Sequence, residues 1–454
     1  MTLEASLIAA VGADHVERID ERRWRVAPGS AAEVAEVIRR ASEQRAAVHA
    51  IGAGSRAPID LPPRHFAALR TPAEPGLAPA RGDTPTPADP RERVLIATRR
   101  LDQVLQLDET SLMVHAQAGL TGLELERILQ PRGLSIGDYP PVVLTSSLGG
   151  IIAVRTPGKS SARHGFFEDA VVGVSAVLAD GRSVHTRIAP RRATGPDLAR
   201  ALMGSEGTIG FITSAVLRIH QKPEARLVGA YILPSMDAAV SAVYLALREE
   251  AAPSGIRIYD RAEAAMHFGP RDLALPVGHV LLCAATAGPT DLAACDRDLI
   301  QSAVLAEGGS TTDTELADLW WRRLHAGEPT PGPVPSLQVM ATPSKLRAVY
   351  HAVIERCAAL GADARAHISR FDADGAVMFF TITGGPTELA AGDRSSFGTN
   401  AGVLAPEIVV IAERAAEQAG AWLLGARQVK LDTYLAALRD ALDPHRIMNP
   451  GTLV

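Results

Sequence analysis

Residues 196–219 read PDLARALMGSEGTIGFITSAVLRI, which predicts a helix, a glycine-rich turn at 204–210 and one apolar strand. Two similar turns come earlier in the chain, IGAGSR at 51–56 and SSLGG at 146–150. Glycine lets the backbone approach a ligand closely and adopt positive φ, so each loop could offer its N–H groups to a phosphate. A single loop of this kind is more often only a tight turn. Three such loops in one chain favour a phosphate-binding site more strongly than any one of them does.

Other nucleotide sites are disfavoured by the same loops. The chain has no GxxxxGK[ST] motif, and no GxGxxG at a strand-to-helix junction followed by an acidic residue about 20 positions later. An NAD or ATP site of these types is therefore not expected.

Composition sets broad limits on the protein. A chain of 454 residues predicts two or three domains, and 47% hydrophobic with 21% charged residues is ordinary for a folded, soluble protein. A net charge of -5 without a run of Lys or Arg gives no sign of nucleic-acid binding. Three cysteines without a CxxC pair are typical of a reducing cytoplasm. No signal peptide or membrane-spanning stretch is predicted.

The first half of the chain reads as helices and strands around the glycine loops. Residues 31–46 have helical spacing and lead into a strand before the first loop. Residues 71–93 are rich in Pro, Gly and charge and predict a mobile surface insertion. Two strands are expected around the polar turn at 108–110. Thr121 and Glu124 form a capping-box pattern, and Gly133 is placed to end that helix.

The second half alternates strand-like and helical segments. Asp180-Gly181 predicts a hairpin turn, and Pro223 is a natural boundary. Beyond it, the alternation predicts an antiparallel sheet with helices on one side. The segment at 431–454 begins with an amphipathic helix and ends in a Pro-Gly turn.

The order of these segments resembles a known family. IGAGSR, the run DETSLMVHAQAGLTGLELERIL at 108–129, SSLGGIIAVRTPG at 146–158, HGFFEDAVVG at 164–173 and the stretch around GSEGTIG follow the order and spacing of FAD-linked oxidases of the vanillyl-alcohol-oxidase (PCMH) type. The resemblance is specific from about 24 to 266 and weaker to the C-terminus, where DPHRIMNPG at 443–451 is similar to a family ending. Within the family, the chain is most similar to alkyldihydroxyacetonephosphate synthases.

The resemblance implies an α+β fold with a two-lobed FAD-binding domain and an antiparallel sheet-and-helix cap. The implied boundaries are 1–221 for the FAD domain, with lobes at about 1–70 and 94–221 around the insertion, 222–430 for the cap, and 431–454 for a segment returning to the FAD domain. The first loop would hold the pyrophosphate, the second the ribityl and flavin side, Arg155 and Thr156 the ring, and the third the adenosine end. The implied FAD-binding residues are Ile51, Gly52, Ala53, Gly54, Ser55, Arg56, Pro140, Thr145, Ser146, Ser147, Gly149, Gly150, Val154, Arg155, Thr156, Ser205, Glu206, Gly207, Thr208, Ile209, Gly210 and Ile212.

Noncovalent binding of FAD is expected. A covalent tether would need a His or Cys, and the first loop has neither after Gly54, although His49 precedes it. Arg56 departs from the small polar residue usual in the family, and a surface charge is its alternative role. His164 aligns with a position close to the flavin, with a hydrogen-bonded core histidine as the equal alternative.

Two departures from the family concern the chemistry. The stretch GAWLLGARQVKLD at 420–432 has no His where relatives carry catalytic or metal-binding histidines, so no metal is expected. Phe379 stands where the synthase has an acid/base tyrosine, and a phenyl ring has no ionisable proton.

The remaining catalytic candidates are Arg257, His367 and His164. Arg257 matches an arginine of the synthase and is suited to gripping a carboxylate or phosphate, against a structural salt bridge. His367 could accept a substrate proton, although a lone His on an apolar strand is more often structural. The cluster at 320–323 (WWRR) could line a cap pocket, but aromatic residues there are more often core.

The leading hypothesis is a cytoplasmic FAD-dependent oxidoreductase that oxidises a small or medium polar, anionic substrate by hydride transfer to flavin N5. It binds a small-molecule substrate and no nucleic acid, and a homodimer is compatible with it. Two alternatives stay open. One is synthase-like group transfer through a flavin adduct, and the other is a flavin-fold binding protein without activity.

Overall fold

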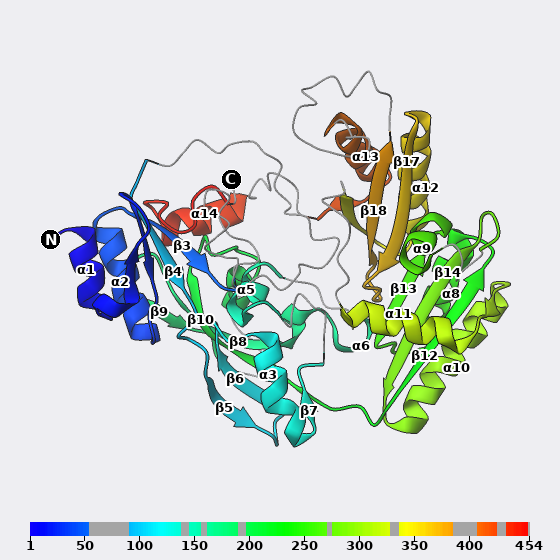
Figure 1. Ribbon diagram of the computed structural model, residues 1–454, viewed down its shortest axis with the longest axis horizontal. Coiled ribbons are helices and arrows are strands. Elements are labelled where there is room, and N and C mark those ends of the chain that lie inside the picture. Colours follow the sequence, from blue (N-terminus) through cyan, green and yellow to red (C-terminus); the bar gives the residue numbers. More distant parts are fainter. Residues whose placement is uncertain are drawn as a thin grey trace.

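The computed structural model describes residues 1–53, 90–137, 145–155, 161–188, 197–269, 275–326, 336–384, 406–424 and 433–452. Of the predicted insertion at 71–93, only 90–93 fall within these ranges, and they lead into strand β4. Figure 1 shows the eight-stranded sheet on one side of the molecule and the sheets of the N-terminal half on the other. In the described part, no helix is both long and apolar enough to cross a membrane.

The first sheet has the strand order β1-β2-β4-β3 (Figure 1). Its strands are Val16–Arg18, Arg23–Val26, Arg93–Ala97 and Ala47–Ile51, in that order, and both β2 and β3 run parallel to β4. Helices α1 (Leu3–Val11) and α2 (Ala31–Glu43) share its core. The predicted helix at 31–46 is thus confirmed. It begins at Ser30, whose hydroxyl accepts from the N–H of Glu33.

The second sheet has the order β5-β6-β10-β8-β9, with strands Val104–Asp108, Met113–Gln117, Phe211–Arg218, Val171–Val177 and Ser183–His185. The region predicted to hold two strands holds three, β4, β5 and β6, because the polar residues at 99–103 also interrupt the backbone. The Asp180-Gly181 hairpin is confirmed, with Ser175 opposite His185 and Gly181 at φ 84°. Around this sheet lie α3 (Gly122–Leu129), α5 (Leu148–Ala153), α6 (Ser161–His164), α7 (Leu198–Leu202), β7 (Leu134–Ser135) and β11 (His220–Gln221).

The capping box that starts α3 is confirmed. The side chain of Thr121 accepts from the N–H of Glu124, and the carboxylate of Glu124 accepts from the N–H of Thr121. After one further helical turn the chain reverses at Gly133, whose φ of 70° is left-handed.

The third sheet is antiparallel throughout, in the order β15-β12-β14-β13-β17-β18-β16-β19. Its strands are Ser310–Thr311, Ala225–Leu233, Val280–Gly288, Gly255–Tyr259, Ala362–Ser369, Ala376–Gly384, Ser336–Ala341 and Trp422–Leu423 in that order. One face packs on α8 (Met236–Arg248), α10 (Thr290–Ala306), α12 (Leu346–Ala359) and α13 (Pro406–Gln418). The opposite face packs on α9 (Arg261–Phe268) and α11 (Thr314–Ala326).

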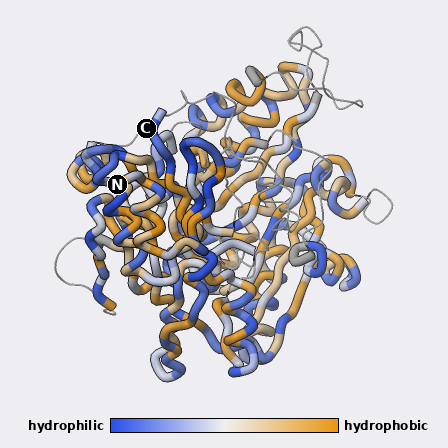
Figure 2. The backbone as a smooth tube through the Cα atoms, turned by 60° about the vertical axis from the view of Figure 1, so that its left-hand side comes forward, coloured by the Kyte–Doolittle hydropathy of each residue, from blue (hydrophilic) through white to orange (hydrophobic). Residues whose placement is uncertain are grey.

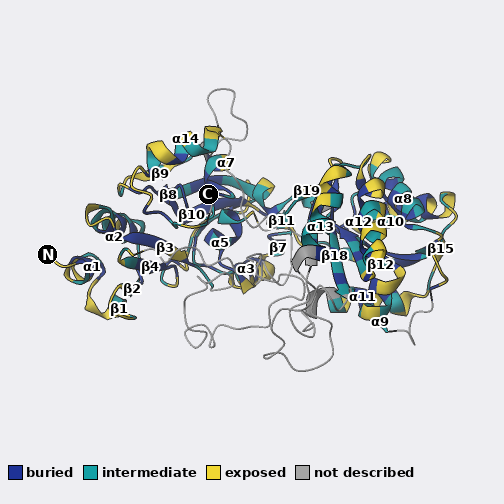
Figure 3. Cartoon of the chain, turned by 90° about the horizontal axis from the view of Figure 1, so that it is seen from above, coloured by how far each residue is buried: buried dark blue, intermediate teal, exposed yellow. Residues whose placement is uncertain are grey.

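The prediction of helices on one side only was therefore wrong for this sheet. Strand β14 is buried at every residue from Val280 to Gly288, which requires cover on both faces. Figure 2 shows hydrophobic and hydrophilic residues alternating along the helices and strands, and Figure 3 shows buried strands with exposed residues on the outer faces of the helices. The predicted α+β class is confirmed.

The C-terminal segment returns to the first sheet. After α14 (Thr433–Leu442), the fully buried carboxylate of Asp443 accepts from the N–H groups of Ile447 at 3.0 Å and Met448 at 2.8 Å. The backbone then bonds β3, because Val48 donates to Ile447 O and Asn449 donates to Val48 O, both at 2.7 Å. We call residues 443–449 the C-terminal clip.

We predict that Asp443→Ala destabilises the protein. It leaves two buried N–H groups without an acceptor, and each costs about 1–3 kcal/mol. Chemical denaturation measures the loss. The control is Asp440→Ala, which removes an exposed carboxylate that pairs with Arg446 on the same segment. Equal stability of the two variants would contradict the role of Asp443.

Candidate functional site

The three glycine-rich loops converge in the structure. A Cβ added to Gly52 would lie 2.2 Å from Ser147 Oγ, so the first loop touches the start of the second. The third loop bonds to α5, which follows the second, because Gly204 donates to Ile152 O and Glu206 to Ala153 O. The C-terminal clip connects the strand before the first loop with the third loop through Asn449. Asn449 Oδ1 accepts a hydrogen bond from His49 Nδ1 at 2.9 Å, and the side-chain NH₂ of Asn449 donates to Glu206 O.

This junction offers backbone donors suited to a phosphate-bearing cofactor. In the described part of the chain, the N–H groups of Gly150 and Gly207 have no acceptor, and they are suited to bind phosphate oxygens. Among the described residues, a Cβ on Gly207 would meet Asn449 first, at 3.9 Å, which leaves room for a ligand against this backbone. Its φ of 78° also favours glycine.

The structure describes most of the predicted FAD-binding residues, but Gly54, Ser55, Arg56, Pro140 and Thr156 lie outside the described residues. Those at or next to the loop junction are Ile51, Gly52, Ala53, Thr145, Ser146, Ser147, Gly149, Gly150, Val154, Ser205, Glu206, Gly207, Thr208, Ile209, Gly210 and Ile212.

Arg155 has protein partners of its own. Its Nε donates to Met203 O at 3.1 Å and lies 3.3 Å from Glu168, and its Nη2 donates to Arg200 O at 3.2 Å. These contacts direct the guanidinium toward the segment before the third loop. A position of Arg155 beside the flavin ring stays a prediction.

Arg257 and His367 lie on one face of the eight-stranded sheet. Along four neighbouring strands, Tyr259 pairs with His367, His367 with Phe379, and Phe379 with Gln338. We call Tyr259, His367, Phe379 and Gln338 the central row. Arg257 precedes Tyr259 by two residues, so it lies on the same face and diagonally next to His367. Two candidates that are 110 positions apart in sequence are thereby neighbours.

The side chains around the central row hold it firmly. The rings of His367 and Phe379 stack with centroids 4.6 Å apart. Arg257 donates to the hydroxyl of Tyr259 at 3.3 Å, and the indole N–H of Trp320 donates to the same oxygen at 3.1 Å. Tyr259 is fully buried, and burial raises its pKa, so its hydroxyl stays protonated at neutral pH.

Sequence reasoning missed the partners of His367. Glu263 on α9 is 3% exposed, and its Oε1 lies 3.1 Å from both His267 Nε2 and His367 Nδ1. Its Oε2 accepts from Arg365 Nε at 2.8 Å. Glu263 and His267 are four residues apart on the helix, a spacing that was visible in RAEAAMHF, but the approach of His367 from β17 was not.

Charges of opposite sign set the protonation of this cluster. Burial and the positive charge of Arg257 lower the pKa of His367 to about 4. Burial alone would raise the pKa of Glu263, but hydrogen bonds with His267 and His367 bring it below its ordinary value. At neutral pH we therefore take Glu263 as charged and His367 as neutral. His367 then donates its Nδ1–H to Glu263 and keeps a lone pair on Nε2.

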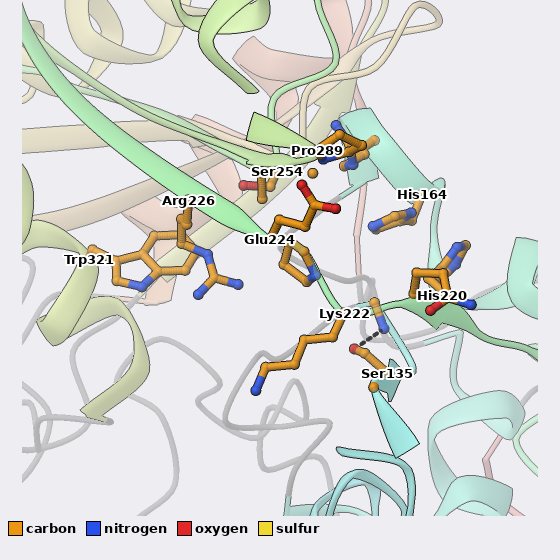
Figure 4. Close-up of a pocket in the computed structure, with 16 residues that line it drawn as sticks. Ser135, His164, His220, Lys222, Glu224, Arg226, Ser254, Pro289 and Trp321 are labelled. Atoms are coloured by element: carbon orange, nitrogen blue, oxygen red, sulfur yellow. Dashed lines mark hydrogen bonds between the residues drawn. The ribbon is translucent and has the colours of Figure 1, made fainter. Parts of the chain in front are cut away.

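His164 lies elsewhere, in a cavity of about 730 Å³ lined by residues of both halves of the chain (Figure 4). It faces His220, with ring centroids 4.0 Å apart. Gly137 leaves room for the pair, because a Cβ there would meet His220 at 2.6 Å. Neither Arg257 nor His367 lines this cavity. His164 thus lines a cavity that the other two candidates do not line, although its helix α6 packs against β13, the strand that carries Arg257.

The cluster at 320–323 divides between core and surface. Trp320, on α11, is buried in the core between this helix and the sheet, which agrees with the alternative that the aromatic residues here belong to the core. Trp321 lines the cavity, where the guanidinium carbon of Arg226 lies 4.7 Å from its ring. Arg322 is exposed, and Arg323 donates to His267 O.

The His164–His220 pair predicts acid sensitivity. Burial, followed by the charges of His220 and Arg163, lowers the pKa of His164 to about 3, and burial also lowers the pKa of His220. A folded-state pKa below the unfolded value of about 6.5 stabilises the fold above that pH, and the contribution is lost as the pH falls from 6.5 toward 3.

Replacing His164 by Gln should flatten this loss by up to about 1.4 kcal/mol per pH unit. Unfolding free energies measured across that window test it. His351→Gln, at an exposed histidine paired with Asp237, is the control. An unchanged pH slope in His164→Gln would show that the pair does not titrate as described.

Comparison with known proteins agrees with this architecture. Residues 77–187 match the family model of an FAD binding domain, and residues 222–391 match the C-terminal domain of FAD linked oxidases. The uncharacterized FAD-linked oxidoreductase YgcU of Escherichia coli K12 is 33% identical over 38% of this chain and 36% of its own length. The alkyldihydroxyacetonephosphate synthase of Dictyostelium discoideum is 34% identical over 39% of this chain and 29% of its own. The aligned part is thus about a third of these relatives.

A solved structure of an alkyldihydroxyacetonephosphate synthase superposes with a TM-score of 0.69 at 20% identity, covering 94% of this chain and 76% of that one. This confirms the predicted fold class. The two domain matches confirm the resemblance seen in the sequence and indicate FAD as the cofactor. The chain is therefore similar, in two separate regions, to both domains of the FAD-linked oxidases.

Proposed function

We propose that the protein is an FAD-dependent oxidoreductase that oxidises a small or medium polar substrate carrying an anionic group. The observation that carries the proposal is the placement of Arg257 beside His367 on one sheet face, in a chain with both domains of the FAD-linked oxidases. When bound, FAD accepts a hydride at its N5 atom. Arg257 binds the anionic group of the substrate, and His367 accepts its proton.

We divide the chain into an FAD domain at 1–221, with lobes at about 1–70 and 94–221, a cap at 222–430, and a returning segment at 431–454. The matched domains, which end at 187 and begin at 222, support this division. The cysteines at 283, 295 and 357 are free, which fits a cytoplasmic protein.

The three loops bind FAD without a covalent bond in this proposal. The N–H groups of Gly150 and Gly207, which have no acceptor among the described residues, bind the phosphates. His49, the nearest candidate for a tether, is 9% exposed and uses Nδ1 for its bond with Asn449. It supports the clip and leaves the flavin untethered.

Arg257 binds the anionic group of the substrate. It is half buried and already oriented by its bond to Tyr259, so little side-chain freedom is lost when an anion binds. The planar fork can hold a carboxylate or a phosphate through two hydrogen bonds.

His367 accepts the proton that the substrate releases. Its bond to Glu263 fixes the ring, and the stack on Phe379 fixes its plane. The lone pair on Nε2 can then take a proton from a substrate hydroxyl. Phe379 supplies packing only, because its ring has no proton to exchange. That absence favours oxidation over synthase-like group transfer.

We predict that Gly207→Val yields a folded protein with little FAD. The added side chain blocks the open backbone of the third loop and is strained at positive φ. FAD released by acid and quantified by absorbance measures occupancy and tests the noncovalent claim together. Gly361→Val is the matched control, with a φ of 69° and open space. Full occupancy in Gly207→Val would remove this loop from the site.

We predict that Arg257→Ala raises KM or abolishes flavin reduction. Loss of a charged anchor costs about 2–5 kcal/mol when the substrate anion is left buried without its partner, and Arg257→Lys should restore only part of it because an ammonium lacks the planar fork. Anaerobic bleaching of the flavin by a panel of anionic alcohols is the measurement. Normal reduction in Arg257→Ala would make the arginine structural.

The same panel separates the reaction classes. The wild type should not exchange the acyl chain of an acyl-dihydroxyacetone phosphate for a fatty alcohol. Robust exchange without bleaching would replace the oxidoreductase assignment by group transfer.

A further inference from the structure

Three metal-binding side chains meet at the edge of the central row. Their ligand atoms, Glu263 Oε1, His267 Nε2 and His367 Nδ1, all lie within 4.8 Å of one another. The two nitrogens lie on the same carboxylate oxygen, each at 3.1 Å. No part of the proposed function requires His267 to be there.

We propose that Glu263, His267 and His367 form a binding site for a divalent first-row transition metal ion such as Zn²⁺. Two imidazoles and one carboxylate are ligands that zinc and iron take in proteins, and three protein ligands leave positions open for water or substrate. The fold supplies the geometry from two elements. Helix α9 presents Glu263 and His267 one turn apart, and strand β17 presents His367.

The surroundings hold the ligands in place, as metal sites require. Arg365 binds the carboxylate oxygen that faces away from the histidines. Phe379 stacks on His367, and the ring of Tyr259 lies 5.2 Å from His267 and 5.9 Å from His367. Asp260 caps α9 by accepting from the N–H of Glu263, which fixes the backbone of that ligand.

Access and charge set the expected affinity. The side chain of His267 is 32% exposed, whereas that of Glu263 is 3% exposed, so an ion can enter beside His267. The guanidinium groups of Arg257 and Arg365 oppose a cation, since only one carboxylate is a ligand. We therefore expect weaker binding than at a closed structural zinc site.

Metal binding and the proposed role of His367 exclude each other. A metal on Nδ1 displaces the proton from that nitrogen, and the neutral ring then carries its proton on Nε2, where no lone pair remains for a substrate. Only this consequence rests on the proposed function. The metal site itself does not.

The test is calorimetric titration of Zn²⁺ into the FAD-loaded full chain after treatment with a chelator. The wild type should show one site. His267→Ala and His367→Ala should each lower the affinity for Zn²⁺ by at least about 10–100-fold, because that is the typical loss when only an outer-shell partner of a metal ligand is removed. His267 is the decisive position because its partial exposure makes the variant tolerable to the fold. His351→Ala is the matched control, since it removes an exposed histidine that pairs with Asp237 at 2.9 Å.

Thermal denaturation gives a second readout that needs no substrate. Zn²⁺ should raise the Tm of the wild type and of His351→Ala, and leave that of His267→Ala unchanged. The absence of a site in the wild type, or a site that survives in both His267→Ala and His367→Ala, would overturn the proposal.

Flavin reduction distinguishes this inference from the proposed function. Zn²⁺ should slow anaerobic reduction over the concentrations that fill the site. If calorimetry shows the site and reduction is not slowed, the metal site stands and His367 is not the proton acceptor.

Discussion

The buried carboxylate of Asp443 fixes the C-terminal clip, which connects strand β3 with the third glycine loop. By accepting from Ile447 and Met448, it turns the chain so that residues 447–449 lie along β3. Asn449 is thereby placed between His49, two residues before the first glycine loop, and Glu206 in the third. The third loop also bonds directly to α5, through Gly204 to Ile152 O and Glu206 to Ala153 O. The clip adds the link between the third loop and the strand before the first loop, and that link starts from a carboxylate far along the chain from both.

A second constraint acts on the eight-stranded sheet. Strand β14 is buried along its whole length, so both faces of the sheet must be covered there, and among the described helices α9 and α11 pack on the face that carries Arg257 and the central row. Polar side chains of the row share this face with the apolar residues under those helices. At Tyr259 the row borders both the buried Trp320, which donates to its hydroxyl, and His267, whose side chain is 32% exposed.

Local patterns in the sequence predicted much of this and could not predict the rest. The capping box of Thr121 and the hairpin at Gly181 depend on residues close in sequence, and the structure confirms both. The helices on the second face of the sheet were missed because periodicity shows that a strand is buried without showing what covers it. Glu263 was missed because its partner His367 is 104 positions away. Strand register, which no local pattern gives, brings them together.

The register also decides which side chain of the central row can do acid–base chemistry. Phe379 has no proton, and an amide such as Gln338 does not titrate at physiological pH. Tyr259 is fully buried and accepts hydrogen bonds from both Arg257 and Trp320, and burial raises its pKa, so it is not a base at neutral pH. His367 is left, and Glu263 decides what it does. With a proton between them, the carboxylate makes His367 a proton acceptor; with a metal ion between them, the same two atoms make it a ligand. The chemistry of this sheet face therefore depends on whether a proton or a metal ion lies between Glu263 Oε1 and His367 Nδ1, which are 3.1 Å apart.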